Sequence, residues 1–184
     1  MSYLILDTET TGTGKTDTVL QLAYQCFDSD GTMTYEYCKV FKPDFDYEIH
    51  EKATEINGFT KEIIDSIGED AEEYTKVLCN MRKFAGRTYV GHNVSFDLRM
   101  LNQDLARYSF GRIEPESFCT MNDPKIKAFV GATDKNNKPK APNLAELYRK
   151  LFGEEFDGAH DALSDVRATA RCFFELKRLG IVTI

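Results

Sequence analysis

The chain has 184 residues, a net charge of −7, 42% apolar residues and no tryptophan. This length and balance predict one folded domain over residues 1–184 and exclude an intrinsically disordered chain. The acidic charge argues against bulk electrostatic binding to long duplex nucleic acid, because such a molecule repels a phosphate backbone.

No apolar stretch approaches the ~20 residues needed to cross a bilayer, and the first residues lack the basic and apolar regions of a secretory signal. Neither a membrane anchor nor export is therefore expected. The five cysteines lie far apart, form no C-x-x-C pair and leave one thiol without a partner. We expect reduced thiols and a cytoplasmic location.

Three strand-like segments open the chain. Ser2 to Asp7 is a short apolar run that ends in a polar loop, and Val19 to Phe27 and Thr32 to Phe41 follow it. The four polar residues Asp28 to Gly31 predict a hairpin between the second and third segments. An antiparallel meander of three strands is therefore expected.

Helical spacing dominates the rest of the chain. Helices are predicted over residues 48–56, 60–66, 69–84, 95–108, 143–152 and 161–179, and brief strands over residues 88–90 and 117–121. Residues 131–142 collect lysine, asparagine and proline, which predicts a mobile basic loop. This order of elements predicts one mixed α/β sheet with helices packed on its faces.

The run Gly12 to Thr16, after the first strand, invites comparison with a phosphate-binding loop in which Lys15 would contact a nucleoside triphosphate. That loop requires a glycine where Glu9 stands, and a carboxylate there would oppose the phosphates unless a metal intervened. A P-loop nucleotide switch is therefore disfavoured, and Gly14 to Thr16 is interpreted as a flexible turn.

Two carboxylates at the end of the first strand are more informative. Asp7 and Glu9 are separated by one residue, so strand alternation directs both side chains to one face of the sheet. They would repel each other unless a divalent cation balanced their charge. A single D-x-E pair is common at strand ends without a metal, so the interpretation needs support from elsewhere in the chain.

Two later segments supply that support. Asp97 lies in the opening turn of a predicted helix, where a favourable interaction with the helix dipole is the alternative role. In the last helix Asp161 is the N-cap candidate, Asp165 lies one turn inside and His160 lies just outside. Four acids at element ends and a histidine suit oxygen-bound divalent metals beside a titratable base. His50 receives no role.

Three segments of the chain together resemble the DEDDh family of 3′-to-5′ exonucleases, which belongs to the ribonuclease H-like superfamily. The matching segments are Asp7 to Gly12, His92 to Asp97 and His160 to Asp165, in the family's order. A sister family carries a tyrosine four positions before the last aspartate, where Asp161 stands here, so the histidine variant is favoured. The resemblance implies an α/β fold with a five-stranded mixed sheet flanked by helices.

The resemblance also implies the site and its cofactors. The metal-binding carboxylates would be Asp7, Glu9, Asp97 and Asp165. Two Mg²⁺ or Mn²⁺ ions would activate water and support the departing 3′ oxygen, and His160 would act as the general base. The implied reaction releases nucleoside 5′-monophosphates from the 3′ end of a single strand.

The substrate and the partners are less sharply defined. DNA is favoured over RNA because the chain resembles proofreading members of the family. An oligoribonuclease or RNA-trimming exonuclease is the alternative within the class, and a catalytically idle nucleic-acid-binding module is the alternative outside it. A DNA polymerase subunit and a second copy of the chain are left open as partners.

Thr10 and Asn93 are the nucleotide contacts that the resemblance implies, and a role in a turn is an equal alternative for each. Two positions depart from the family. Thr13 stands where a bulky apolar residue commonly follows the glycine of the first motif, so separation of duplex ends is not implied. Asn57 stands where a histidine commonly precedes glycine, so a contact with the terminal nucleotide is not implied there.

Two further features have competing interpretations. Phe96 is expected in the core rather than as a stacking platform for a base. The lysines among Lys135 to Lys140 either guide a single strand by electrostatic attraction or are solvated cations of a loop.

Overall fold

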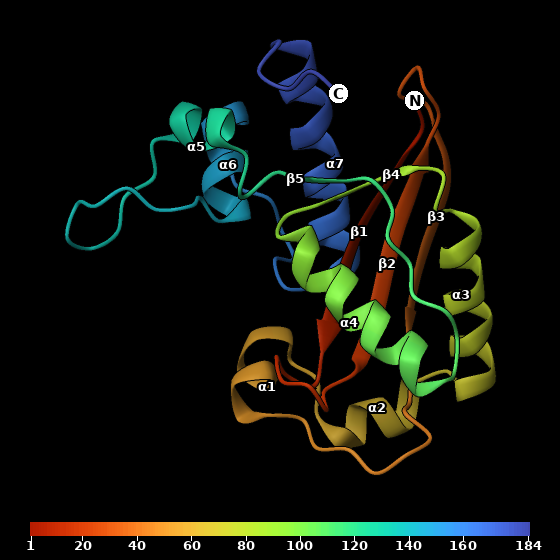
Figure 1. Cartoon of the computed structure of the whole chain (residues 1–184). Coiled ribbons are helices and arrows are strands. Elements are labelled where there is room, and N and C mark those ends of the chain that lie inside the picture. Colours follow the sequence, from red (N-terminus) through yellow and green to blue (C-terminus); the bar gives the residue numbers. More distant parts are fainter.

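The computed structural model describes residues 1–184, and Figure 1 shows a central sheet with helices on both sides. The strands are β1 (Tyr3–Thr10), β2 (Val19–Phe27), β3 (Met33–Val40), β4 (Thr88–Gly91) and β5 (Ser117–Cys119). They lie in the order β3-β2-β1-β4-β5. The first three pair antiparallel, and β4 and β5 continue the sheet in parallel with β1. The predicted mixed five-stranded sheet, with its N-terminal meander, is confirmed.

Seven helices cover this sheet. They are α1 (Glu51–Asn57), α2 (Lys61–Ile67), α3 (Ala71–Lys83), α4 (Val94–Arg107), α5 (Pro124–Val130), α6 (Leu144–Phe152) and α7 (Ala162–Arg178). Six of them were predicted to within a few residues at each end. The helix α5 was not predicted, although its start carries a recognisable signal. Asp123 accepts hydrogen bonds from two backbone amides of the first turn, and Pro124 follows it.

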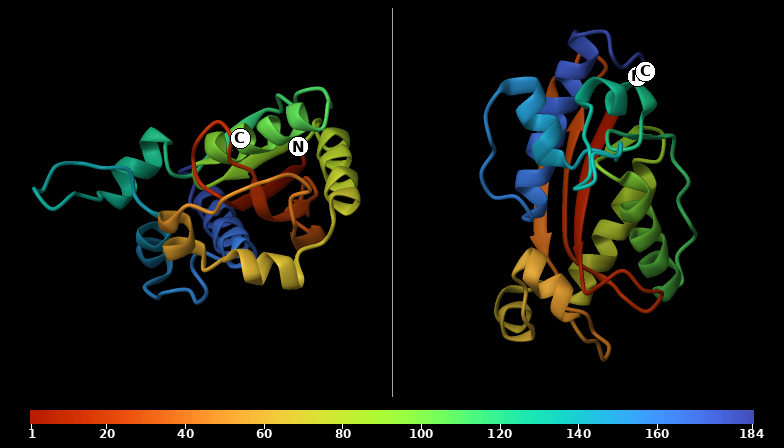
Figure 2. Two further views of the ribbon diagram at one scale, coloured as in Figure 1. Left: turned by 90° about the horizontal axis from the view of Figure 1, so that it is seen from below. Right: turned by 90° about the vertical axis from the view of Figure 1, so that its left-hand side faces the viewer.

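The central strand β1 contributes to two separate apolar cores because its side chains alternate between the faces of the sheet. Tyr3 and Ile5 pack with residues of α6 and α7 on one face. Leu4 and Leu6 pack with residues of α3 and α4 on the other. Figure 2 shows α7 and α4 on opposite sides of the sheet. The N-terminal ends of both helices are thereby held against the same strand.

β1 is longer than predicted. The expected strand ended at Asp7, but the structure continues it to Thr10, because Thr8, Glu9 and Thr10 pair with the start of β2. A register irregularity between Glu9 and Thr10 ends the regular pairing. Both acids of the first motif are therefore fixed within a paired strand rather than in a loop.

The segment 131–142, predicted as a mobile loop, is a hydrogen-bonded hairpin with an antiparallel bridge between Thr133 and Pro139. Its turn is closed by Asp134, whose carboxylate accepts the backbone N–H groups of Asn136 and Lys138. An aspartate that bonds the backbone two residues ahead stabilises a turn, which explains why this segment is ordered rather than mobile. Separately, no helix has the length and apolar composition that a membrane-spanning segment requires.

Candidate active site

Three carboxylates from distant parts of the chain meet beside β1. Asp7 and Glu9 lie on one face of the strand, and Asp165 reaches them from the first turn of α7. Each offers an oxygen, and these oxygens all lie within 4.8 Å of one another. Such a group of oxygen ligands is suited to a hard divalent cation.

Asp97 approaches the group from the other side of β1. It is buried in the first turn of α4, and its Oδ1 accepts hydrogen bonds from the Thr8 backbone N–H (3.0 Å) and the Thr8 hydroxyl (2.8 Å). These bonds tie α4 to the strand between the two acids of the first motif. Asp97 is not part of the three-residue group, but its charge acts on Asp7.

The start of α7 places both His160 and Asp165. Asp161 caps the helix by accepting the Ser164 backbone N–H at 3.1 Å, as the sequence predicted. His160 precedes the cap with φ +70°, and its peptide N–H donates to Asp165 Oδ2 at 3.2 Å. The imidazole itself is exposed to solvent. The backbone of His160 thus orients the carboxylate while its side chain stays free.

Gln21 of β2 fixes this turn, and the sequence analysis did not single it out. Gln21 is buried and lies opposite Glu9 in the strand register, so the two side chains share a face. Its amide donates to Asp161 Oδ1 at 2.9 Å and accepts the Ala162 backbone N–H at 3.1 Å. A glutamine at one of two positions in a largely apolar strand was the available signal.

Burial raises the pKa of all four acids, and repulsion from neighbouring carboxylates adds to it at Asp7, Glu9 and Asp165. Burial, then the charge of Asp165, raises the pKa of Glu9 to about 8. Burial raises the pKa of Asp97 to about 7, against the hydrogen bonds from Thr8, and that of Asp165 to about 6. Burial, then the charges of Asp97 and Asp165, raises the pKa of Asp7 well above its usual range.

The raised pKa values show that no nearby cation of the protein balances the four carboxylates when they are ionised. Ionised carboxylates packed this closely are stable only beside a cation or with some of them protonated. Divalent metals supply that charge through the oxygen ligands present. The residues therefore fit the metal ions that the sequence predicted.

A cavity of about 600 Å³ adjoins Glu9. Its walls come from the end of β1, the loop that follows, α1 and α4, and it has room for one small organic ligand. Phe96 packs against the apolar core on the α4 face of the sheet, as expected, and its partly buried side chain also lines this cavity. Asn57 and Thr13, the two departures from the family pattern, line it as well.

The two predicted nucleotide contacts differ in position. Thr10 lines the cavity, but its hydroxyl donates to the Gly12 carbonyl at 2.7 Å within the turn after β1. Asn93 precedes α4 in a left-handed conformation with φ +86° and makes no capping hydrogen bond through its side chain. Both residues thus shape turns, and Thr10 alone faces the cavity.

The loop after β1 leads to a strand rather than to a helix. A P-loop requires a helix there, because the helix N-terminus and the glycine-rich amides together bind phosphates. Instead, Asp17 closes the loop by accepting the Thr11 hydroxyl at 2.9 Å and approaching His50 Nε2 at 3.1 Å. His50, which had no assigned role, lines the cavity through this contact.

A family model described as Exonuclease (RNase T) matches residues 4–173. The chain belongs to the exonuclease family. The predicted class, a DEDDh-type 3′-to-5′ exonuclease of the ribonuclease H-like superfamily, is thereby confirmed at the level of the family.

Individual relatives of this exonuclease agree with that assignment. The DNA polymerase III PolC-type proteins of Staphylococcus haemolyticus and Staphylococcus aureus are 25% identical over 98% of the chain. The chain spans only 12% of their length.

Solved structures show the same fold. E. coli Exonuclease I in complex with a dA16 oligonucleotide matches 96% of the chain with a TM-score of 0.79 and 21% identity, over 41% of its own length. Exonuclease I from Methylocaldum szegediense matches 96% of the chain with a TM-score of 0.77 and 22% identity, over 40% of its own length. The predicted ribonuclease H-like fold is confirmed.

Proposed function

We propose that this chain is a metal-dependent 3′-to-5′ exonuclease that releases nucleoside 5′-monophosphates from single-stranded nucleic acid, with DNA favoured over RNA. The observation that carries the proposal is the meeting of Asp7, Glu9 and Asp165 beside a cavity of about 600 Å³. Carboxylates so arranged are suited to metal-assisted attack on a phosphodiester.

In the proposed mechanism, Asp7, Glu9, Asp97 and Asp165 hold the metal ions. Two divalent ions, Mg²⁺ or Mn²⁺, held by these carboxylates would supply Lewis-acid activation of water and charge stabilisation at the 3′ oxygen. Thr8 supports Asp97, and the His160 peptide N–H supports Asp165, so neither carboxylate rotates freely. His160 accepts the proton of the attacking water through its exposed imidazole.

The cavity beside Glu9 accepts the terminal nucleotide in this proposal. Phe96 and Ile56 supply apolar wall area, and Asn57 supplies a polar group close to Glu9. A cavity of about 600 Å³ is large enough for one nucleotide. Removal of one nucleotide at a time is consistent with that volume.

DNA is favoured because the relatives point to it. Exonuclease I was solved in complex with DNA oligonucleotides, and the PolC-type proteins are DNA polymerases. A DNA polymerase subunit is accordingly the proposed protein partner. The homodimer stays a prediction.

Digestion of a 5′-labelled single strand in Mg²⁺ tests the proposal. We expect a ladder of shortened products, release of nucleoside 5′-monophosphates, and faster digestion of DNA than of a matched RNA. Asp7→Asn should abolish the ladder, whereas Lys15→Gln, a matched change in the exposed loop, should leave it intact. Equal digestion by the parent and Asp7→Asn would identify a contaminating nuclease and overturn the proposal.

A further inference from the structure

Positive charge gathers in two segments of this acidic chain, residues 74–96, which carry four lysines and arginines and no acid, and residues 124–150. Residues 124–150 carry seven lysines and arginines and two acids, a local charge of +5 in a chain of net charge −7. The segment comprises α5, the hairpin 131–142 and the first turns of α6. We refer to the hairpin, residues 131–142, as the basic arm.

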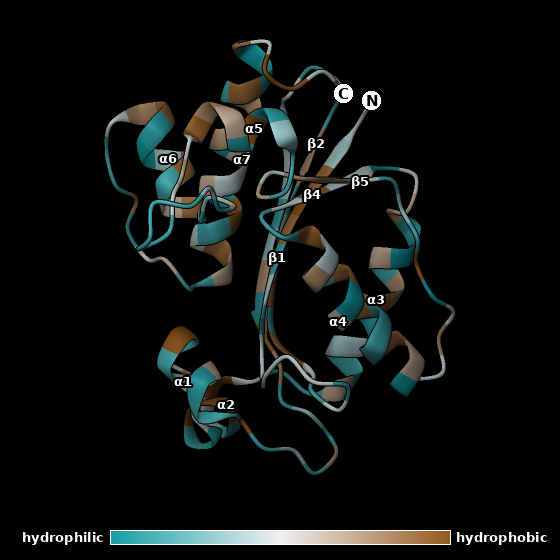
Figure 3. Cartoon of the chain, turned by 60° about the vertical axis from the view of Figure 1, so that its left-hand side comes forward, coloured by the Kyte–Doolittle hydropathy of each residue, from teal (hydrophilic) through white to brown (hydrophobic).

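The arm holds a defined shape. The Lys140 backbone N–H donates to the Ala132 carbonyl at 3.0 Å, and the Asp134 backbone N–H donates to the Lys138 carbonyl at 2.8 Å. Figures 1 and 3 show a largely hydrophilic hairpin that projects well beyond the helices around it. Its backbone is therefore organised without support from the core.

Two cations of the arm have no acidic partner. Lys135 and Lys138 are exposed and form no ion pair, whereas Lys140 pairs with Glu146 at 2.7 Å. Asp134 is the single acid of the arm, and the amides of Lys138 and Asn136 lower its pKa by bonding its carboxylate. The carboxylate of Asp134 is thus bound within the turn, and Lys135 and Lys138 are available to bind an external anion.

The base of the arm is fixed to the second motif. His92 Nε2 donates to the Pro142 carbonyl at 3.0 Å, and its Nδ1 lies 2.9 Å from the Thr120 hydroxyl. His92 directly precedes the turn into α4, the helix that carries Asp97. In Figure 1 the arm and α1, which lines the cavity beside Glu9, both lie toward the left-hand edge of the molecule, the arm in the upper part of the view and α1 in the lower.

We propose that the basic arm binds the phosphates of a single strand on the 5′ side of the nucleotide that occupies the cavity. This inference rests on the proposed function. A polyanion that leaves the cavity meets a molecule of net charge −7, from which the arm projects the exposed cations Lys135 and Lys138. Lysine contacts to phosphate position a strand without reading its sequence.

The composition of the arm excludes a stacking platform and disfavours a protein partner. Residues 131–142 contain no aromatic, leucine, isoleucine or methionine side chain. Protein interfaces depend on such large side chains as anchors, and base stacking depends on aromatic ones. Binding by the arm is therefore electrostatic, independent of sequence and strongly dependent on salt.

The test measures the hydrolysis of two substrates by the parent and by the double variant Lys135→Gln, Lys138→Gln of the full chain. One substrate is a DNA single strand of about 20 nucleotides. The other is the p-nitrophenyl ester of thymidine 5′-monophosphate, which has no further phosphates that could reach the arm. We expect KM for the strand to rise about 10-fold at low salt, with kcat unchanged, and KM for the ester to stay constant. The slope of log KM against log salt should fall by about 0.7 for each lysine removed.

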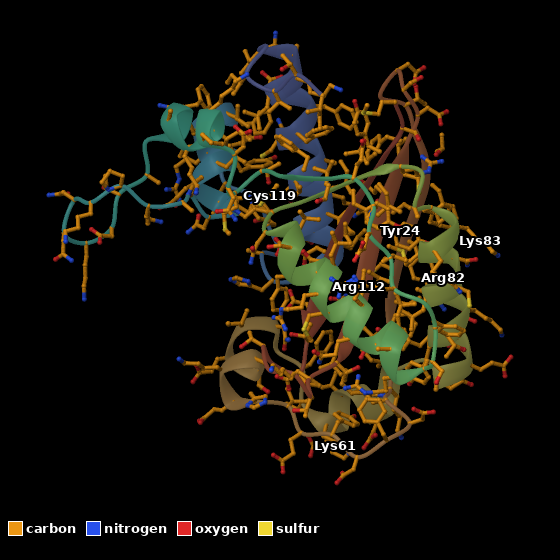
Figure 4. The ribbon with its side chains drawn as sticks, in the orientation of Figure 1. Tyr24, Lys61, Arg82, Lys83, Arg112 and Cys119 are labelled. Carbon is orange, nitrogen blue, oxygen red and sulfur yellow. The ribbon has the colours of Figure 1, made fainter.

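The matched control is Lys61→Gln, Lys83→Gln, which removes the same charge from exposed positions. Figure 4 shows both lysines away from the arm, on α2 and at the end of α3. The control should leave KM for the strand within about twofold of the parent. An equal rise in both double variants would assign the effect to the overall field and overturn the proposal.

The remaining outcomes distinguish the arm proposal from the proposed nuclease function. An unchanged KM for the strand would show that the two lysines contact solvent or an acidic protein instead of the strand. It would overturn the arm proposal without affecting the proposed nuclease function. A parallel rise in KM for the ester would show that the arm acts through the fold, which also overturns it. Failure of the parent to hydrolyse either substrate in Mg²⁺ would refute the proposed function itself.

Discussion

At the scale of single residues, Asp7 is a buried carboxyl that is repelled by its acidic neighbours. Burial and the charges of Asp97 and Asp165 raise its pKa, so at neutral pH the ionised form destabilises the metal-free fold. We expect Asp7→Asn, which keeps the shape and removes the charge, to stabilise the metal-free protein by about 1 kcal/mol and to lower kcat at least ~10³-fold. Thermal unfolding in EDTA and digestion of a single strand measure both effects. A lower Tm with full activity would contradict this account.

His160 gives a second prediction, because its backbone and its side chain have separate tasks. A residue with φ +70° accepts glycine without strain, so His160→Gly should keep the turn and the peptide N–H that supports Asp165. We expect kcat to fall ~10²- to 10⁴-fold and free imidazole in solution to restore part of it. Metal binding should be unchanged, as measured by titration calorimetry. Full activity of the variant would exclude the imidazole as the base.

His92 makes the stability of the protein depend on pH. Burial lowers its pKa from 6.5 to about 4, so the folded state holds a neutral imidazole where the unfolded chain would bind a proton. Its contribution is complete above pH 6.5 and is lost as the pH falls to about 4, a loss of about 3 kcal/mol.

Urea unfolding at a series of pH values measures this loss. His92→Gln should show a smaller decline over the same interval, because glutamine does not titrate. The same decline in both proteins would place the titrating group elsewhere.

At the scale of elements, the junction of β2 with α7 decides how the third motif meets the first. Gln21 bonds both Asp161 and the Ala162 amide, so it sets the angle at which α7 presents Asp165. We expect Gln21→Met, which keeps the volume, to lower kcat about 10-fold with KM nearly unchanged and to destabilise the fold by ~1–2 kcal/mol. Steady-state kinetics and urea unfolding check this. A loss of stability with unchanged kcat would reduce Gln21 to a purely structural residue.

The regular elements could be predicted because their signals are local. The strand from Val19 to Phe27 was placed to the residue, since an apolar run is bounded there by polar residues. The start of α7 was predicted from the position of Asp161, an N-cap residue, before an apolar helical pattern. These features depend only on neighbours in sequence.

Features that depend on tertiary pairing could not be placed in the same way. The extension of β1 through Glu9 requires β2 beside it, and its polar residues resemble a loop when considered alone. The contact of Gln21 with Asp161 joins residues far apart in the chain. Phe96 faces a cavity that exists only once α1 and α4 flank β1.

At the scale of the whole molecule, topology explains how distant motifs meet. β1 is the central strand, with α7 against one face and α4 against the other, so both helices can direct an aspartate to its acidic end. The order of the motifs predicted which carboxylates should converge, and the structure brings three of them within 4.8 Å and places the fourth beside Thr8. The spacing of the motifs along the sequence could not predict that the carboxylate oxygens lie within 4.8 Å of one another.

The most direct test of the central claim is anomalous X-ray scattering from a crystal soaked in Mn²⁺. We predict manganese peaks within ligand distance of Asp7, Glu9 and Asp165, and their disappearance in Asp7→Asn. A well-ordered crystal of the parent with no manganese beside these three carboxylates would contradict the account.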